Sequence, residues 1–346
     1  MKKIFILLFS LLMIFGCGES EKPATKGQKR IDPHKPMAWG HKHVIYVVAD
    51  DAIWKKAEPQ LRRTLERYVF TTENEKFFEV KRAEYKDLDL YYKFNNLIFL
   101  GDLKDNTPVN EYIKGIISDK IKQQVKENQV GIYPLENLWA NDQYVLFMLG
   151  ANREKLLKLN YLILNKTFEL FRTKMLERVK RTLYLPEQHK KYEFNEYSWT
   201  LDLPLKYRLY RKDMNNNFIS YIARLKERAD RYIAVYYEDS ETDIVDKDWL
   251  IDKRAELAWK YYDEDEYAPD KMRTEKAEIA GHKGWKISGM WINKKYTVGG
   301  AYQAFAFYDE RTKRAYLIDN SVYFPEGYKL DALLELEVIS NTLKIK

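Results

Sequence analysis

The sequence contains few of the residues that usually mark chemistry. Its 346 residues include one cysteine, 5 histidines, 14 glycines and 10 prolines. A single cysteine excludes an intramolecular disulfide, so the fold depends on its core alone, even in an oxidising compartment. Phosphate-binding loops, serine-hydrolase elbows, zinc-protease helices and dinucleotide fingerprints are also missing. The sequence therefore predicts no catalytic residue, no metal and no cofactor.

Long apolar runs are missing too, except at the start of the chain. Lys2 and Lys3 precede the run Ile4–Phe15, which only Ser10 interrupts. This run is too short to span a bilayer, which takes about 20 apolar residues. It has the length of the apolar part of a secretory signal. We therefore predict that residues 1–16 are a signal peptide.

The one cysteine, Cys17, directly follows this segment. With residues 14–16 it resembles the lipobox of bacterial lipoproteins, whose cysteine receives fatty chains such as palmitate. Several such chains give a stable membrane anchor, at about 0.8 kcal/mol per buried CH₂. The residue after the lipidated cysteine is Gly18 and not aspartate, which favours sorting to the outer membrane. The protein is then expected to face the periplasm or the cell surface. The alternative is an ordinary cleaved signal with a bystander cysteine.

The remaining composition is that of a folded protein with a mixed surface. Hydrophobic residues make up 45% and charged residues 32% of the chain. The formal net charge is +7. Cleavage of the signal peptide removes two lysines, which leaves 7 − 2 = +5 for the mature chain. Basic and acidic residues are interspersed, which is unlike a nucleic-acid-binding surface. The expected partners are the membrane, through the lipid, and an envelope protein or glycan, but no nucleic acid.

The pattern of residues divides the mature chain into a tether and two domains. Residues 17–36 are polar with three prolines, which predicts a lipidated flexible tether. Residues 37–184 alternate strand and helix, which predicts an N-terminal α/β domain with helices on one sheet face. Residues 190–346 predict a C-terminal antiparallel sheet packed by helices, after a link at 185–189. The expected fold class is α+β.

Apolar runs and helix-capping residues predict where the strands and helices of the first domain lie. Strands are expected at His43–Ala49, Asn96–Leu100 and Tyr144–Leu149. Asn152 is a suitable cap for one long helix reaching about Arg181. Pro59 is expected to separate two short helices, because proline suits a first helical turn.

The second domain shows short strands, two helices and one clear hairpin. A helix is expected to end at Tyr262, and a last helix to cover Lys329–Thr342. The hairpin is expected around residues 309–313. The expected strands are Glu196–Leu201, Lys206–Arg211, Phe218–Ala223, Tyr232–Tyr237, Lys276–Asn293, Ala301–Tyr308 and Arg314–Phe324. This order resembles the α/β/α sandwich of photosystem-accessory and nuclear-import proteins.

One segment suggests a ligand site. On a strand, Trp285, Gly289 and Trp291 point to the same face. Gly289 between two tryptophans leaves room for a flat ligand, and Gly299 with Gly300 is expected to form a turn at the rim. The alternative is that both tryptophans fill the core under a helix while the glycines serve bends.

Three sets of polar residues have a structural interpretation that is simpler than a catalytic or metal-binding role. Asp50 and Asp51 are paired carboxylates or a helix cap. His41 and His43 are metal ligands on one strand face or a solvated strand start. The acidic run at 263–266 is a cation site or a solvated helix end. We favour the second reading in each case.

Several short motifs together resemble a known family. The first half carries residues 47–51 with Trp54 and residues 137–140, and the second carries 284–285, 289–291, 298–300, Asp309 with Arg314, and 322–325. Their order is similar to a family of envelope lipoproteins known only as domain of unknown function 4837, over roughly residues 43–343. The resemblance implies an envelope lipoprotein and identifies no catalytic residue.

Two functions fit these observations. The preferred one is a non-enzymatic binding or envelope-assembly component. The alternative is a carbohydrate-binding protein or hydrolase acting on envelope polymers, with Trp285 and Trp291 as a stacking platform. An open cleft with converging carboxylates of perturbed pKa would favour the alternative. Buried tryptophans with no polar pocket would favour the first.

Overall fold

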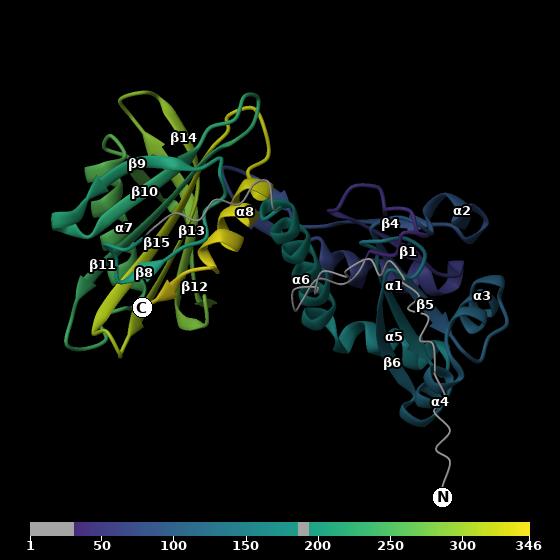
Figure 1. Cartoon of the computed structure of the whole chain (residues 1–346). Helices are drawn as coiled ribbons and strands as arrows, with labels where there is room; N and C mark the ends of the chain where they lie inside the picture. The colour runs from purple at the N-terminus through teal and green to yellow at the C-terminus, as the bar shows by residue number, and fades with distance from the viewer. Residues whose placement is uncertain (1–30, 186–193) are drawn as a thin grey trace, which may run out of the picture.

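The computed structural model describes residues 31–185 and 194–346, which form two separate large sheets with their helices (Figure 1). This arrangement confirms the α+β class. The predicted signal peptide, Cys17, residues 17–30 of the tether and residues 186–189 of the link lie outside the described residues.

The first sheet has five strands in the order β4-β1-β5-β7-β6. Four of these strands are parallel, and β6 runs antiparallel to β7. The strands are β1 (Val44–Val48), β4 (Glu79–Ala83), β5 (Asn96–Asp102), β6 (Val130–Glu136) and β7 (Tyr144–Gly150). Every residue of β5 and β7 is buried, as expected for parallel strands covered on both faces.

Helices cover both faces of this sheet, so the prediction of helices on one face was wrong. The helices α1 (Asp51–Leu65), α5 (Arg153–Leu162) and α6 (Leu164–Leu183) pack on the face that carries Val47. The helices α2 (Leu88–Tyr91), α3 (Pro108–Ile116) and α4 (Asp119–Asn128) pack on the face of Val48. Successive strand residues point to opposite faces, so a continuously apolar strand needs a layer on each side.

Two helix boundaries differ from prediction. Asp50 Oδ1 accepts a hydrogen bond from the Ile53 N–H at 2.9 Å, which confirms the cap, but α1 then continues through Pro59. Its buried stripe extends on both sides of the proline and holds the helix together. The long helix predicted after Asn152 is two helices that meet at Ile163. No helix within residues 31–185 and 194–346 has both the length and the apolar character needed to cross a membrane.

The second sheet has seven strands in the order β12-β13-β14-β15-β11-β10-β9, and all neighbours are antiparallel. The strands are β9 (Arg208–Asp213), β10 (Phe218–Ala223), β11 (Asp230–Asp239), β12 (Glu266–Ile279), β13 (His282–Asn293), β14 (Val298–Asp309) and β15 (Arg314–Tyr323). The predicted single strand Lys276–Asn293 is a hairpin of β12 and β13 instead. It turns at Ala280 and Gly281, whose φ angles are 52° and 84°. The predicted hairpin around 309–313 joins β14 and β15.

One helix packs on each face of the second sheet. Helix α7 (Lys247–Tyr261) covers the face that carries Ile287 and Trp291, and α8 (Leu330–Ser340) covers the other. A short strand, β8 (Trp199–Thr200), lies outside the large sheet and pairs with β16 (Lys344–Ile345).

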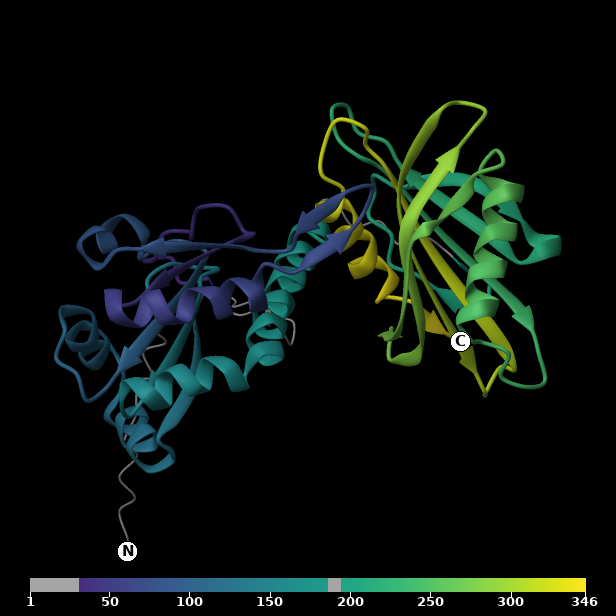
Figure 2. The same ribbon diagram turned by 180° about the vertical axis from the view of Figure 1, so that it is seen from behind.

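The two halves of the chain meet at α8. Leu330 and Leu334 of this helix belong to the apolar core of the first sheet. A small hairpin of β2 (Tyr68–Phe70) and β3 (Asn74–Lys76) extends from the first half toward the second (Figure 2). It brings the buried Glu75 against the start of α8.

Candidate ligand-binding pocket

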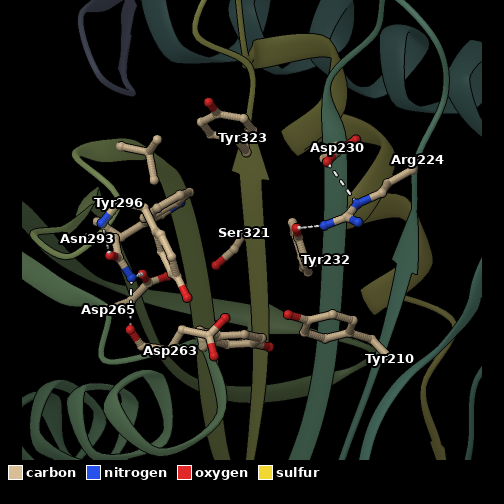
Figure 3. Close-up of a pocket in the computed structure, with 13 residues that line it drawn as sticks. Tyr210, Arg224, Asp230, Tyr232, Asp263, Asp265, Asn293, Tyr296, Ser321 and Tyr323 are labelled. Atoms are coloured by element: carbon tan, nitrogen blue, oxygen red, sulfur yellow. Dashed lines mark hydrogen bonds and ion pairs between the residues drawn. The ribbon is translucent and has the colours of Figure 1, made fainter.

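A pocket of about 270 Å³ opens on the α7 face of the second sheet, where α7 ends (Figure 3). Its residues come from five strands of the sheet, the loop between β10 and β11, the turn after α7 and the turn between β13 and β14. They are Tyr210, Arg224, Asp230, Tyr232, Tyr262, Asp263, Asp265, Trp291, Asn293, Tyr296, Val298, Ser321 and Tyr323. The pocket therefore combines aromatic rings with three carboxylates.

Aromatic rings supply most of the apolar wall. The Tyr210 and Tyr232 rings meet edge to face at 5.4 Å, and those of Trp291 and Tyr323 lie 6.1 Å apart. Trp291 is 6% exposed, and its Nε1 has no hydrogen-bond partner among the described residues. The ring thus lines the wall while its Nε1 stays buried.

The acidic wall is held by one asparagine. Asn293 Nδ2 donates to Asp265 Oδ1 at 2.8 Å and to the backbone oxygen of Asp263 at 2.9 Å. Asn293 Oδ1 accepts from the Tyr296 N–H at 2.9 Å. These bonds fix the turn after α7 against the turn that carries Tyr296. Burial raises the pKa of Asp265 to about 6.

The opposite wall carries an ion pair. Arg224 Nε lies 3.1 Å from Asp230 Oδ2, and Arg224 Nη2 donates to the Tyr232 hydroxyl at 3.2 Å. Burial raises the pKa of Asp230, although Arg224 opposes that shift. This wall is close to neutral, because each charge has its partner.

The floor is formed by Ser321 on β15. Arg254, 1% exposed on α7, donates through Nη2 to Ser321 Oγ at 3.4 Å and through Nε to Asp319 Oδ1 at 3.3 Å. Its guanidinium carbon lies 3.7 Å from the centre of the Tyr302 ring. Because Ser321 Oγ accepts from beneath, its own hydrogen is available to a ligand.

The structure separates the two tryptophans of the predicted site. Both lie on the α7 face of β13, with Gly289 between them. Trp291 lines the pocket, whereas Trp285 borders a different depression with Lys276 and Tyr308. The predicted stacking platform is therefore one ring at this pocket, and its binding role stays a prediction.

The predicted rim turn at Gly299 and Gly300 was wrong, because both lie within β14, opposite Ile292 and Trp291. A Cβ on Gly300 would lie 2.1 Å from the Val322 oxygen and 2.7 Å from the Trp291 ring. A Cβ on Gly289 would lie 2.9 Å from the Tyr302 hydroxyl. The glycines admit neighbouring rings and backbone, and the turn at the rim is the one that carries Tyr296.

Sequence reasoning missed the wall formed by β9, β11 and the loop between β10 and β11. Tyr210, Arg224, Asp230 and Tyr232 carry no local motif, and only the high tyrosine count of 27 hinted at such a wall. In the acidic run, Asp263 is exposed as expected, but Asp265 is half-buried in the pocket. Within the described part of the chain, no three histidine, cysteine or acidic side chains are placed to hold a metal ion.

Three solved structures are similar to parts of this chain, each at low sequence identity. Mog1p, a Ran-binding protein of Saccharomyces cerevisiae, is 12% identical over 45% of this chain and 95% of its own, with a TM-score of 0.33. LpqN of Mycobacterium tuberculosis, involved in cell envelope biogenesis, is 11% identical over 43% and 83%, with a TM-score of 0.28. A protein of Bacteroides thetaiotaomicron is 9% identical over 43% and 45%, with a TM-score of 0.24. None of the curated proteins compared with the chain is significantly similar to it.

Family models match both halves of the chain. Residues 187–342 match Domain of unknown function (DUF4837), which confirms the expected family for the second half. Residues 38–184 match a separate model, Domain of unknown function (DUF8532), although the resemblance was expected to extend over both halves. The second half of the chain is thus similar to the DUF4837 model and the first half to the DUF8532 model.

Proposed function

We propose that this protein is a lipid-anchored component of the cell envelope that binds a glycan in the pocket beside α7. The observation that carries the proposal is the combination of aromatic rings with polar groups in one open pocket. A sugar ring presents a C–H face that packs on aromatic rings and hydroxyl groups that bond to polar side chains. This changes the preference reached from sequence, which placed glycan binding second.

The polar groups around the pocket suit hydroxyl groups, which donate and accept at once. Ser321 is a donor, and the carboxylates of Asp263 and Asp265 are acceptors. A volume of about 270 Å³ is small for a ligand pocket. It fits one ring of a longer chain, with the rest of the glycan outside.

The proposed anchor gives a direct prediction. The Cys17→Ser chain has no thiol to acylate, so it should move from the detergent phase to the aqueous phase in detergent partition. The test compares it with the parent chain after expression in a bacterium that processes lipoproteins. A variant that still enters the detergent phase like the parent contradicts the proposed anchor.

Tyr296 offers a test of glycan binding that does not disturb the core. Its side chain is 55% exposed at the pocket rim. Tyr296→Ala should weaken binding of an envelope glycan about two- to thirteenfold, since an aromatic contact contributes about 0.5–1.5 kcal/mol. Titration calorimetry of the full chain, in a detergent without a sugar headgroup, measures the change.

Tyr328→Ala is the matched control, because Tyr328 is 74% exposed and does not line the pocket. It should leave the affinity unchanged. Equal affinities for the parent and both variants would place the glycan elsewhere. Failure of envelope glycans to bind the parent chain would overturn the proposal.

Hydrolysis is the second candidate, because a carboxyl group with a pKa of about 6 can act as a general acid. Asp265 lies beside Asp263, and glycoside hydrolases commonly use two carboxyl groups. Incubating the protein with envelope glycan and measuring new reducing ends tests this candidate. If the protein binds the glycan but releases no reducing ends, the hydrolase candidate is wrong and the binding proposal stands.

A further inference from the structure

The three carboxylates of the pocket are not equally neutralised. Asp230 pairs with Arg224 at 3.1 Å, and Asp263 lies 3.7 Å from Arg211 Nη2. Asp265 takes part in no ion pair within the described part of the chain. Arg224 is the one basic residue among those that line the pocket, so their formal charge is 1 − 3 = −2.

Among the described residues, no cation forms a direct ion pair with Asp265, although Arg254 favours its charged form at longer range. Arg254, on α7 behind the floor, is engaged by Asp319 of β15 at 3.3 Å. The next residue in the chain, Glu266, pairs with Lys294 at 2.7 Å. Asn293 of β13 donates one hydrogen bond to Asp265, and Asp263 adds a second negative charge.

Aromatic rings stand on the same side of the pocket as this carboxylate. Figure 3 shows Tyr296, Asn293 and Asp265 together on one wall, opposite the pair of Arg224 and Asp230. Aromatic faces carry partial negative charge and attract cations. A carboxylate and ring faces together favour a positively charged group over a neutral or anionic one.

We infer that the ligand carries a free, positively charged amino group, as in a glycan with non-acetylated amino sugars, and that Asp265 receives this group. The inference rests on the proposed glycan-binding function and names its ligand class. It excludes acetylated sugars as the preferred ligand, since acetylation removes the charge. It also excludes phosphorylated and uronic acid sugars, which the negative pocket repels.

The pH dependence of binding follows from the carboxylate. Because burial raises the pKa of Asp265 to about 6, much of this group is protonated at pH 5 and ionised at pH 7. An amino group with a pKa of about 8 stays charged over that range. Affinity for the amino glycan should therefore rise from pH 5 to pH 7, while affinity for an acetylated glycan should not.

The experiment titrates the full chain, in a detergent without a sugar headgroup, with a glucosamine tetramer and an N-acetylglucosamine tetramer. We expect the parent to bind the glucosamine tetramer at least tenfold more tightly at pH 7. Asp265→Asn should reduce this preference to about twofold and remove the rise with pH. Glu264→Gln is the control, since Glu264 is an exposed acid of the same run that does not line the pocket, and it should keep the preference.

The outcomes separate the inference from the proposed function. Equal affinity of the parent for both tetramers overturns the inference and leaves glycan binding intact. No binding of either tetramer overturns both. A preference lost in Glu264→Gln but kept in Asp265→Asn overturns the role of Asp265. Melting temperatures of the variants identify any loss that comes from unfolding.

Discussion

Replacing Arg178 with methionine should lower the free energy of unfolding by about 3–5 kcal/mol, the range for breaking a buried ion pair from one side. Arg178 lies on α6 and is 1% exposed. Its Nη1 donates to Asn96 Oδ1 at 2.7 Å, and its Nη2 donates to the backbone oxygens of Asn95 and Asp142 at 2.8 and 2.7 Å. Its Nε lies 3.2 Å from Asp142 Oδ1.

The cost comes from the acceptors that methionine leaves behind. Asn95 and Asn96 are buried at the start of β5, and Asp142 precedes β7. One guanidinium thus connects α6 to the ends of two central strands. Methionine fills the space but donates no hydrogen bond, so these oxygens lose the donors that replaced water.

Arg181→Met is the matched control, because Arg181 binds the same Asp142 carboxylate at 2.5 Å but is 43% exposed. Exposed ion pairs contribute little, so this variant should lose less than about 1 kcal/mol. Urea unfolding followed by circular dichroism compares the two. Equal losses would show that burial of Arg178 adds nothing to its contacts.

The sequence was informative where strands are buried on both faces. The runs at Asn96–Leu100 and Tyr144–Leu149 are apolar throughout, and both proved to be central strands of the first sheet. The first half of β12 was missed because β12 is an edge strand with mostly exposed residues. Pro269 lies in it where the pairing with β13 is irregular, as proline in sheets usually does. An exposed edge strand shows no apolar pattern to read.

The pocket was predictable only in part, because long-range pairing assembles it. Alternation along a strand identified Trp291, which lines the pocket. Tyr232 and Ser321 meet because β11 pairs with β15, and no local pattern specifies that register. The acidic run resembled a solvated helix end, since nothing in the sequence shows that Asn293 holds Asp265. Burial of one carboxylate in a run of four acids is a tertiary property.

Replacing Glu75 with glutamine should weaken the junction between the two halves of the chain by about 2–3 kcal/mol. Glu75 is 3% exposed, and its carboxylate accepts from the Lys329 N–H at 2.8 Å and the Leu330 N–H at 2.9 Å. It also accepts from the Thr71 hydroxyl at 2.7 Å. Hydrogen bonds to a charged group contribute about 1.5–3 kcal/mol, and the helix dipole adds to them.

Glutamine changes this contact in two ways while it keeps the size of the side chain. It removes the negative charge at the start of α8, and its NH₂ group replaces one acceptor with a donor that faces backbone N–H groups. Lys329 is not a side-chain cap for α8, so Glu75 supplies the acceptor from the other half of the chain. Leu330 and Leu334 should then separate more readily from the core of the first sheet.

Hydrogen exchange of the first turn of α8 measures this loosening locally, and urea unfolding measures its total cost. Exchange at Leu333 and Leu334 should accelerate about 30- to 150-fold, the equivalent of 2–3 kcal/mol if those amides exchange by opening of this junction. Glu73→Gln, an exposed change in the same hairpin, should leave exchange as it is in the parent. Equal exchange in both variants would mean that apolar contacts alone hold α8 against the first half, and the carboxylate would then have no part in joining the two domains.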